Sequence, residues 1–235
     1  MYTDIHSHIL PGVDDGSQDV SETLELLNMM KQQGIDTVVA TPHYHAEVCL
    51  SPKKHSEKCK EVLESLRAAL PNDAINILLG YEVRYFRGIA QSEEVASLKL
   101  GNTNHILLEL PPYKISSKVA DEIVEFSLNF GVKPIIAHIE RYMKSSSFGA
   151  FLNIIEEGFA EAQINCDSLL FQKLRKPCLR LIKEGYISYI ATDTHSVLER
   201  PPHLTPAIDV LNSKLGKKET EKLLENSKVL ISQGL

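Results

Sequence analysis

Short apolar runs alternate with longer amphipathic segments along most of the chain. The runs are rich in β-branched residues, which is typical of strands, and the segments place apolar residues three or four apart, which is typical of helices. The first such segment is preceded by Ser17 or Asp19 as a helix N-cap and ends at Gly34. Its apolar positions at helical spacing are Val20, Leu24, Leu27 and Met30. The pattern therefore predicts repeated strand–helix units.

Six further strands follow the first apolar run, which lies at the N-terminus. They are predicted at residues 37–40, 75–79, 105–108, 133–137, 162–164 and 186–191. Helices are predicted between them and after the last, at residues 52–70, 117–130, 148–157, 168–183, 204–215 and 217–232. Pro177 predicts a break in the fourth of these helices, because proline lacks the backbone N–H that a helix interior uses. The units continue to the C-terminus without a linker or a low-complexity segment.

Alternating strands and helices favour parallel pairing, because each helix carries the chain back to the same end of the sheet. Seven such units close more readily into a barrel than they spread as an open sheet. We therefore predict an α/β fold, a distorted (β/α)7 TIM-like barrel. The chain has 235 residues, 43% of them apolar, which is enough to bury a full core, so a single domain over residues 1–235 is expected.

Charge and composition limit the classes of partner that the sequence predicts. The net charge is −6 and no block of lysines or arginines stands out, which argues against a nucleic-acid partner. No apolar run approaches the roughly 18 residues that a membrane span needs, and the chain opens directly into a strand without a leader pattern. We therefore expect a soluble cytoplasmic protein with no membrane insertion, and four reduced cysteines without paired spacing. A homo-oligomer stays open.

Imidazoles and carboxylates follow nearly every predicted strand, at its C-terminal end. These residues are His6, His8, His43, Glu82, Glu109, His138, Asp193 and His195. Any one of them has an ordinary explanation as a helix cap or a solvated loop residue. Together they are harder to explain in that way, because surface residues scattered by chance have no reason to follow successive strands in the same phase. The rim at the carboxyl ends of parallel strands is also where barrel enzymes carry their chemistry.

Two pairs in this set have the spacing of metal ligands. His6 and His8 are two residues apart, as are Asp193 and His195, so each pair points to one face of an extended chain. Imidazole and carboxylate without thiolate suit Zn²⁺, Mn²⁺ or Fe²⁺, and there are more candidate ligands than one ion needs. The residues alone therefore predict a hydrolase with two or three metal ions. The sequence has no Cys-x5-Arg loop, Gly-x-Ser-x-Gly elbow or Gly-x4-Gly-Lys-[Ser/Thr] loop that would support another scheme.

The same residues lie in longer motifs that extend over nearly the whole chain. These motifs are Asp4-Ile5-His6-Ser7-His8-Ile9-Leu10-Pro11, Val13-Asp14-Asp15-Gly16, Ala40-Thr41-Pro42-His43, Glu82-Val83-Arg84, Ala137-His138-Ile139-Glu140-Arg141-Tyr142, Asp193-Thr194-His195 and Arg200-Pro201-Pro202-His203. Together they resemble the PHP-domain metallophosphatases and, within them, the bacterial protein-tyrosine phosphatases encoded with capsule and exopolysaccharide machinery.

The resemblance implies three divalent metal ions, with manganese expected first and iron or zinc as alternatives. Glu82 would bridge two of the ions, and Asp15 enters the set of ligands only through the resemblance. The three sets that it implies are His6, His8, Glu82 and Asp193; Glu82, Glu109 and His138; and Asp15, His43 and His195.

Two arginines are expected to bind the phosphoryl group of the substrate. Arg141 comes just after His138 and Arg200 just after His195, and a guanidinium group can donate to two phosphoryl oxygens at once. We count both arginines, with Asp193, as the predicted catalytic residues. Salt bridging at the rim is the alternative interpretation of the arginines.

The predicted function is that of a metal-dependent phosphotyrosine-protein phosphatase using metal-activated hydroxide, and the resemblance suggests a tyrosine-rich tail on a capsule-regulating kinase as substrate. The alternatives are a small-molecule phosphatase of the histidinol-phosphate kind, a barrel nuclease with a similar ligand set, and a metal-free interaction module. The intact ligand set argues against the last, and the acidic net charge argues against the nuclease. His45 and His203 have no assigned role. His55 is interpreted as a solvated histidine beside a half-buried Cys59, four residues later on a helix, and His105 is interpreted as structural.

Overall fold

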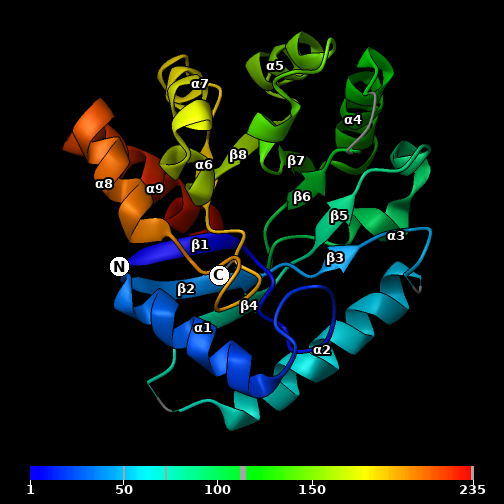
Figure 1. The fold of residues 1–235 in the computed structure, drawn as a ribbon. Coiled ribbons are helices and arrows are strands. Elements are labelled where there is room, and N and C mark those ends of the chain that lie inside the picture. The colour runs from blue at the N-terminus through cyan, green and yellow to red at the C-terminus, as the bar shows by residue number, and fades with distance from the viewer. Residues whose placement is uncertain (50, 72, 112–114, 234–235) are drawn as a thin grey trace.

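A computed structural model of the chain describes residues 1–49, 51–71, 73–111 and 115–233. Strands and helices alternate along it, and the larger helices lie outside the strands (Figure 1). The first part of the chain forms β1 (Tyr2–Ser7), α1 (Val20–Gln32), β2 (Ile35–Ala40), β3 (His43–Tyr44), α2 (Pro52–Ala69), β4 (Asn76–Leu79), β5 (Glu82–Arg84), the 3-10 helix η1 (Ile89–Gln91) and α3 (Glu93–Ala96). The rest forms β6 (His105–Glu109), α4 (Ser117–Phe130), β7 (Lys133–Ile136), the 3-10 helix η2 (Ile139–Tyr142), α5 (Phe148–Glu156), β8 (Glu161–Asn165), α6 (Cys166–Leu170), α7 (Gln172–Lys183), β9 (Tyr189–Ala191), α8 (Leu204–Leu215) and α9 (Lys217–Ser232).

The strands form two sheets in which every pairing is parallel, so the predicted parallel α/β organisation is confirmed. One sheet has the order β1-β2-β4, and the other has the order β3-β5-β6-β7-β8-β9. The short strands β3 and β5 follow almost directly after β2 and β4 and pair with each other, with His43 opposite Glu82. These two residues therefore lie within short strands of the second sheet, and not just past a strand as the sequence predicted.

The first and last strands of the chain lie side by side, although they belong to different sheets. Ser7 pairs with Thr194 in an isolated parallel bridge, and the amide of His8 donates to the carbonyl of Thr194 at 2.8 Å. The amide of Asp193 donates to the carbonyl of His6 at 2.9 Å. Backbone hydrogen bonds therefore hold the two predicted ligand pairs next to each other.

Three parts of the fold differ from the prediction. The last strand is shorter, because its pairing with β8 begins only at Tyr189. The helical segment breaks at Phe171, where the backbone is extended, and α7 continues through Pro177. Proline removes only one helical N–H, and α7 keeps a buried face through Cys178 and Leu181, so the predicted break at the proline was wrong. The third difference is that η1 and α3 were not predicted.

The buried face of α1 is turned slightly from the predicted one. Asp19 is its N-cap, and the carboxylate accepts from the amide of Glu22 at 2.9 Å. Val20 is 39% exposed and Leu24 is only partly buried. The residues of α1 that are buried are Thr23, Leu26, Leu27 and Met30.

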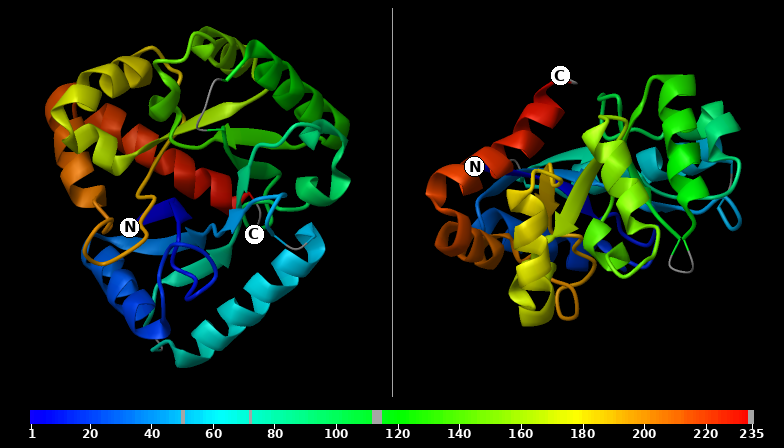
Figure 2. Two further views of the ribbon diagram at one scale, coloured as in Figure 1. Left: turned by 45° about the vertical axis from the view of Figure 1, so that its right-hand side comes forward. Right: turned by 90° about the horizontal axis from the view of Figure 1, so that it is seen from above.

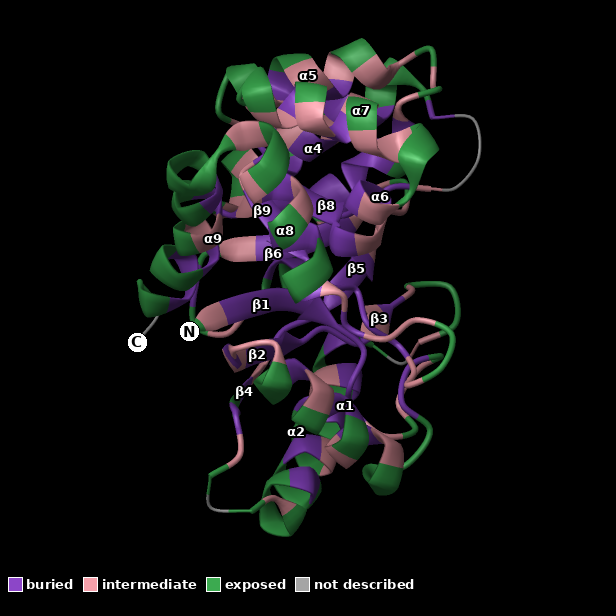
Figure 3. Ribbon diagram, turned by 60° about the vertical axis from the view of Figure 1, so that its left-hand side comes forward, coloured by how far each residue is buried: buried purple, intermediate pink, exposed green. Residues whose placement is uncertain are grey.

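Burial follows the layers of the fold. Buried residues fill the strands and the inner faces of the helices, whereas the outer faces of the helices are exposed (Figure 3). The C-terminal helix α9, red in Figure 2, packs against β1 and β9. Within the described residues, no helix has both the length and the apolarity that crossing a membrane requires.

Candidate metal centre

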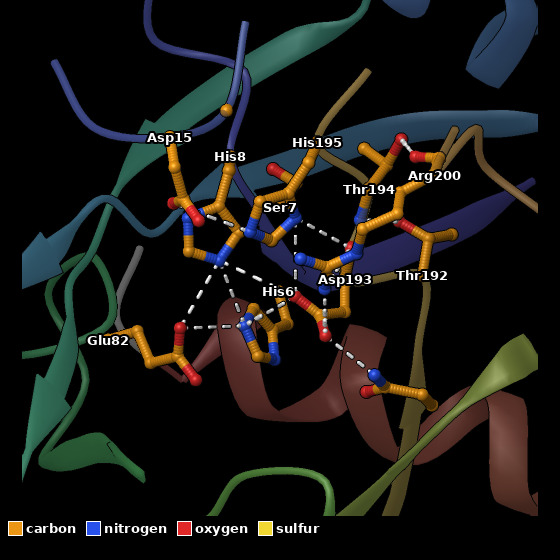
Figure 4. Close-up of polar contacts among 12 residues, drawn as sticks. His6, Ser7, His8, Asp15, Glu82, Thr192, Asp193, Thr194, His195 and Arg200 are labelled. Atoms are coloured by element: carbon orange, nitrogen blue, oxygen red, sulfur yellow. Dashed lines mark hydrogen bonds and ion pairs between the residues drawn. The ribbon is translucent and has the colours of Figure 1, made fainter. Parts of the chain in front are cut away.

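The candidate ligands come from elements far apart in sequence and meet in one place. Figure 4 shows the imidazoles of His6, His8 and His195 beside the carboxylates of Glu82 and Asp193. Ligand atoms in each of four groups lie within 4.8 Å of one another. The groups are His6, His8 and Asp193; His8, Asp15, His43 and His195; Glu82, Glu109 and His138; and His43, His45 and Glu109. The structure therefore brings together all nine residues that were predicted to bind metal.

Four of these ligand atoms lie in close contact. The Nε2 atoms of His6 and His8 are 3.2 Å apart, and each lies 3.2–3.5 Å from Glu82 Oε2 and Asp193 Oδ1. Imidazole nitrogen and carboxylate oxygen are the ligands that Zn²⁺ and similar divalent ions take in proteins. Two carboxylate oxygens and two imidazole nitrogens so close together need shared protons or a cation between them. This donor set fits a divalent metal ion.

Glu82 lies at the centre of the site and has one oxygen without a hydrogen bond. Its Oε1 is 2.9 Å from His138 Nε2. Its Oε2 is buried and has no described partner in hydrogen-bond geometry, although His43 Nδ1 is 3.0 Å away. Unpartnered buried polar atoms are rare in folded proteins because they cost stability. A cation beside Glu82 would satisfy this oxygen.

The electrostatics of the site favour positive charge. Burial lowers the pKa of His8, but the carboxylates of Asp14, Asp193 and Glu82 outweigh burial and raise the pKa well above its ordinary value. Burial likewise raises the pKa of Glu82, but His6 and its neighbouring imidazoles outweigh burial and lower the pKa well below its ordinary value. The protein alone balances its carboxylates with protons on imidazole. Metal ions can replace those protons, since ligand histidines must be neutral.

Two of the candidate ligands have an unusual backbone conformation. His138 has φ 33° and Asp193 has φ 51°, and they are the only non-glycine residues with positive φ in the described part of the chain. This left-handed conformation costs roughly 1–2 kcal/mol for a residue with a Cβ. Such strain persists where the surrounding structure enforces it, and it clusters at functional sites. Here it lets the chain turn sharply at the ends of β7 and β9.

The loop after β1 folds back to bring two aspartates to the site. The amide of Ser17 donates to the carbonyl of His8 at 2.9 Å. Gly16 passes so close to this carbonyl that a Cβ would lie 2.1 Å from its oxygen, so only glycine fits. This close return places Asp14 beside the Nδ1 atom of His8 and Asp15 near His43 and His195.

Residues that the sequence analysis did not select orient two of the imidazoles. Asp14 Oδ2 lies 2.8 Å from His8 Nδ1, and Gln163 Oε1 lies 3.2 Å from His6 Nδ1. In both cases the Nδ1 atom is engaged and Nε2 is left facing the other candidate ligands. Metal-binding histidines are commonly held in this way by a carboxylate or carbonyl group. A polar residue within the buried strand β8 was the only sequence signal for Gln163.

Both predicted catalytic arginines contact Asp193. Arg141 Nη2 is 2.8 Å from Asp193 Oδ2, and Arg200 Nη2 is 2.6 Å from the same oxygen. Asn165 Nδ2 donates to it as well, at 2.6 Å. Each arginine uses one terminal nitrogen, and their side chains are 44% and 37% exposed. The Nε and Nη1 groups of both arginines therefore make no contact with Asp193, and both side chains are partly exposed.

Asp15 is the most exposed of the candidate ligands. Its side chain is 68% exposed, and its Oδ1 is 3.4 Å from His43 Nε2 and 3.7 Å from His195 Nε2. The hydrogen bond with His43 lowers the pKa of Asp15 to about 2. The residue is therefore an ionised carboxylate at the solvent edge of the cluster.

Two histidines without an assigned role have different surroundings. His45 lies with His43 and Glu109, and its buried Nε2 has no hydrogen-bond partner in the described structure. His203 Nδ1 lies 2.5 Å from Asp167 Oδ1. His45 therefore extends the cluster, whereas His203 pairs with a carboxylate that is not part of it.

The remaining two histidines lie outside the cluster. His55 is only 6% exposed and its Nε2 is 3.6 Å from the Sγ of Cys59, so it is buried and not solvated. His105 opens β6, and its Nε2 is 3.5 Å from Glu161 Oε2. Neither belongs to a group of potential metal ligands within the described residues.

The whole length of the chain is similar to proteins of capsule synthesis. The family model described as capsular polysaccharide synthesis, CpsB/CapC, matches residues 2–232. The tyrosine-protein phosphatase YwqE of Bacillus subtilis is 32% identical over 234 residues, covering 97% of this chain and 91% of the relative. The tyrosine-protein phosphatase CpsB of Streptococcus agalactiae serotype III is 27% identical over 238 residues, covering 97% of each.

Solved structures resemble the fold to different degrees. One comes from work on YwqE of Bacillus subtilis and CpsB of Streptococcus pneumoniae, described as unique metal-dependent tyrosine phosphatases. It has a TM-score of 0.84 at 29% identity, covering 99% of this chain and 95% of that chain. A β-aspartyl dipeptidase of Fervidobacterium islandicum has a TM-score of 0.54 at 14% identity, covering 97% of this chain and 74% of that chain, and shares the fold alone.

Proposed function

The chain belongs to the CpsB/CapC family of capsular polysaccharide synthesis, and from this premise we propose that its cluster of imidazoles and carboxylates hydrolyses phosphotyrosine in proteins. The enzyme is a metal-dependent tyrosine phosphatase, a hydrolase, like its relatives of that name. The observation that carries the proposal is the close approach of the His6 and His8 imidazoles to each other and to Glu82 and Asp193, with contacts of 3.2–3.5 Å. Neither a histidinol-phosphate enzyme nor a nuclease is named among these relatives.

The proposal includes three divalent ions, with manganese expected first and iron or zinc as alternatives. The first ion would be held by His6, His8, Glu82 and Asp193. Glu82 would reach the second through its other oxygen, beside Glu109 and His138, and the third would lie among Asp15, His43 and His195. When bound, such ions supply the Lewis acidity that polarises a phosphoryl group and activates water. The groupings of ligand atoms within 4.8 Å support these sets.

The charge of the proposed site favours a phosphomonoester. Three dications bring six positive charges, and the carboxylates of Asp15, Glu82, Glu109 and Asp193 return four. The excess of two attracts a dianion, and the cluster opens to solvent at Asp15. No side-chain nucleophile is needed in this scheme, because water is the attacking group.

Arg141 and Arg200 would bind the phosphoryl oxygens. Both guanidinium groups are held by Asp193 Oδ2, and their Nε and Nη1 groups do not contact Asp193. Donors fixed in this way before the substrate binds stabilise the charge that develops on the transferring phosphoryl group. We therefore keep these arginines and Asp193 as the proposed catalytic residues, Asp193 acting as ligand and as anchor for both arginines.

We also propose that the two sheets form one distorted (β/α)7 barrel, in a single domain over residues 1–235. The short strands β3 and β5 follow β2 and β4 closely along the chain but pair in the other sheet, which links the sheets on one side. The bridge between Ser7 and Thr194 links them on the other side. These two links support the proposal, because a closed barrel would leave the candidate ligands around one rim.

The most specific part of the proposal is the physiological substrate. A phosphotyrosine protein is the substrate class, and we propose the tyrosine-rich tail of a capsule-regulating kinase in the cytoplasm. The test compares phosphotyrosine peptides with histidinol phosphate and bis-p-nitrophenyl phosphate, with metal content measured on the same samples. Fast turnover of the peptides that is lost with chelator and returns with Mn²⁺ supports the proposal. Preferential turnover of histidinol phosphate, or full activity in the metal-free protein, contradicts it.

A further inference from the structure

The candidate metal centre opens into a cavity that extends well beyond the predicted ligands. This cavity has a volume of about 670 Å³, and its inner end is lined by Asp15, His43 and Glu109. Its outer end is lined by Lys58, on α2, and by Val48, which is 79% exposed. A phosphotyrosine at the metal centre would therefore have its neighbouring residues in this outer part.

A second cavity joins the first at the segment after β3. It has a volume of about 600 Å³ and shares His45, Val48 and Arg84 with the first cavity. Its other side is formed by the chain after β5, including Phe86 and Arg87. The two cavities together make a continuous groove leading away from the metal centre, and we call it the flanking groove.

Arg84 connects the metal centre to the flanking groove. It is two residues after Glu82 on β5, so both side chains point to the same face of the strand. Its Nε is 3.8 Å from Glu109 Oε2, and the side chain is 35% exposed. At that distance the contact with Glu109 is a loose ion pair, and the guanidinium group can also meet a ligand in the groove.

Away from the metal centre, the residues lining the groove carry more positive charge than negative charge. Lys58 and Arg87 are exposed and form no ion pair with any described residue. Apart from the acidic groups gathered at the metal centre, Glu47 is the only acidic residue among the described lining residues. The lining of the two cavities as a whole has three basic and four acidic residues, but three of those acids, Asp14, Asp15 and Glu109, lie at the metal centre, which leaves Glu47 against the three cations in the outer part.

The part of the groove that carries Arg87 is firmly anchored. The amide of Tyr85 donates to the carbonyl of Glu109 at 2.8 Å. The hydroxyl of Tyr85 donates to Glu122, and the amide of Gly88 donates to the other oxygen of the same carboxylate at 2.5 Å. The turn from residue 85 to 88 is therefore tied at both ends to α4 and β6, which fixes the backbone of Arg87 beside the groove.

We propose that the flanking groove binds the substrate residues next to the phosphotyrosine and that Lys58, Arg84 and Arg87 select an anionic side chain there. The anionic group is a carboxylate or a second phosphoryl group, and the exposed apolar surface of Val48 packs against the peptide beside it. This inference rests on the proposed function and deepens it, since it names a feature of the substrate sequence. Selection of charge beside the reacting group acts on encounter and specificity more than on chemistry.

The test measures kcat/KM of the metal-loaded enzyme for three phosphotyrosine peptides that differ only in the flanking residues. One peptide has neutral neighbours, one has an aspartate and one has a phosphoserine beside the phosphotyrosine. We expect the wild type to prefer an anionic peptide over the neutral one by roughly three- to tenfold, as for exposed ion pairs. Arg87→Glu should abolish or invert this ratio, and Lys183→Glu, the same change of charge type on the exposed end of α7, should keep the wild-type ratio.

The outcomes separate the inference from the function on which it rests. Preference for the aspartate peptide alone, or for the phosphoserine peptide alone, supports the groove and identifies which anion it binds. Equal kcat/KM for all three peptides overturns the inference and leaves the phosphatase intact, as does an unchanged ratio in Arg87→Glu. No hydrolysis of any peptide by the metal-loaded wild type overturns the proposed function and the inference together. A preference that shrinks as salt is raised further supports the electrostatic origin.

Discussion

Two buried carboxylates in neighbouring parts of the molecule are treated by the fold in opposite ways. Asp4, on β1, accepts hydrogen bonds from the amides of His6 and Thr192 and from the hydroxyl of Thr192. Glu82, on β5, is surrounded by imidazoles at 2.9–3.3 Å and keeps one oxygen without a hydrogen bond. Asp4 is 2% exposed and Glu82 is 1% exposed, so burial alone does not distinguish them.

The difference shows how a structural carboxylate is told from a functional one. Asp4 and Thr192, which we call the latch, join the first and last strands with ordinary donors and acceptors, and nothing further is needed to stabilise them. Burial raises the pKa of Asp4 to about 6, with the hydrogen bonds from Thr192 opposing it. The cluster around Glu82 has the charge and the geometry of a site that something else completes. Hydrogen-bond satisfaction, and not burial, is therefore what distinguishes these two carboxylates.

The largest expected effect comes from neutralising Glu82. Glu82→Gln keeps the shape of the side chain but removes the charge that would bridge two ions. We expect it to lose more than one equivalent of metal and about a hundredfold or more of turnover, because even residues that only support metal ligands cost ten- to a hundredfold. Elemental analysis and a phosphotyrosine-peptide assay measure both. A full metal complement in this variant would remove the bridging assignment and the contrast with Asp4.

Arg141→Lys tests whether the rim does more than balance charge. Lysine keeps the positive charge beside Asp193 but cannot donate two parallel hydrogen bonds to a phosphoryl group. We expect the variant to keep its metals and to lose roughly tenfold to a hundredfold of turnover. If Arg141 only formed a salt bridge with Asp193, turnover of the variant would stay near that of the wild type. Metal content measured on the same sample separates loss of the clamp from loss of the ions.

Replacing Asp4 in the latch should lower stability and leave metal binding unchanged, the opposite of what is expected for Glu82. Asp4→Asn leaves at least one buried donor of Thr192 or His6 without its acceptor. We expect the free energy of unfolding to fall by about 1–3 kcal/mol while the metal content per folded protein stays that of the wild type. Denaturant unfolding and elemental analysis measure these two quantities. Loss of metal from folded Asp4→Asn at the level seen for Glu82→Gln would show that the two carboxylates are not separable.

The sequence was informative about both regions where a repeating pattern exists. The helix predicted at residues 117–130 is α4 with the same bounds, since Gly131 ends it in a left-handed conformation. The strand ends brought eight candidate ligands together without knowledge of the fold. Periodicity could not separate β3 and β5 from the strands before them, because each has only two or three residues. It also could not locate the break at Phe171, which depends on how α6 and α7 pack and not on a local helix breaker.

The parts of the site that were missed share one property. Asp14 and Gln163 act through a histidine nitrogen that faces away from the cluster, so they follow no strand-end pattern and have no spacing of their own. Asp15 was selected only through the resemblance, because it lies in a loop and is largely exposed. Side chains on the far side of a ligand become visible only when the distances between segments are known. Ligands at strand ends can therefore be predicted from the sequence, whereas the residues that orient those ligands cannot.

The smallest effect should come from a histidine outside the cluster. Burial lowers the pKa of His105, while Glu161 partly opposes this. The unfolded chain therefore binds a proton near pH 6.5 that the folded protein binds only at lower pH, so the contribution of His105 to stability is present above about pH 6.5 and is lost as the pH falls through the folded pKa. His105→Gln cannot titrate, and the wild type should lose more of its free energy of unfolding than the variant between pH 8 and pH 5. Measured in chelated protein, the effect should be smaller than that of Asp4→Asn, because His105 is partly exposed at the edge of β6. The rim histidines titrate in both proteins and cancel in the difference, so an equal loss in the two would mean that His105 binds its proton as readily when folded as when unfolded.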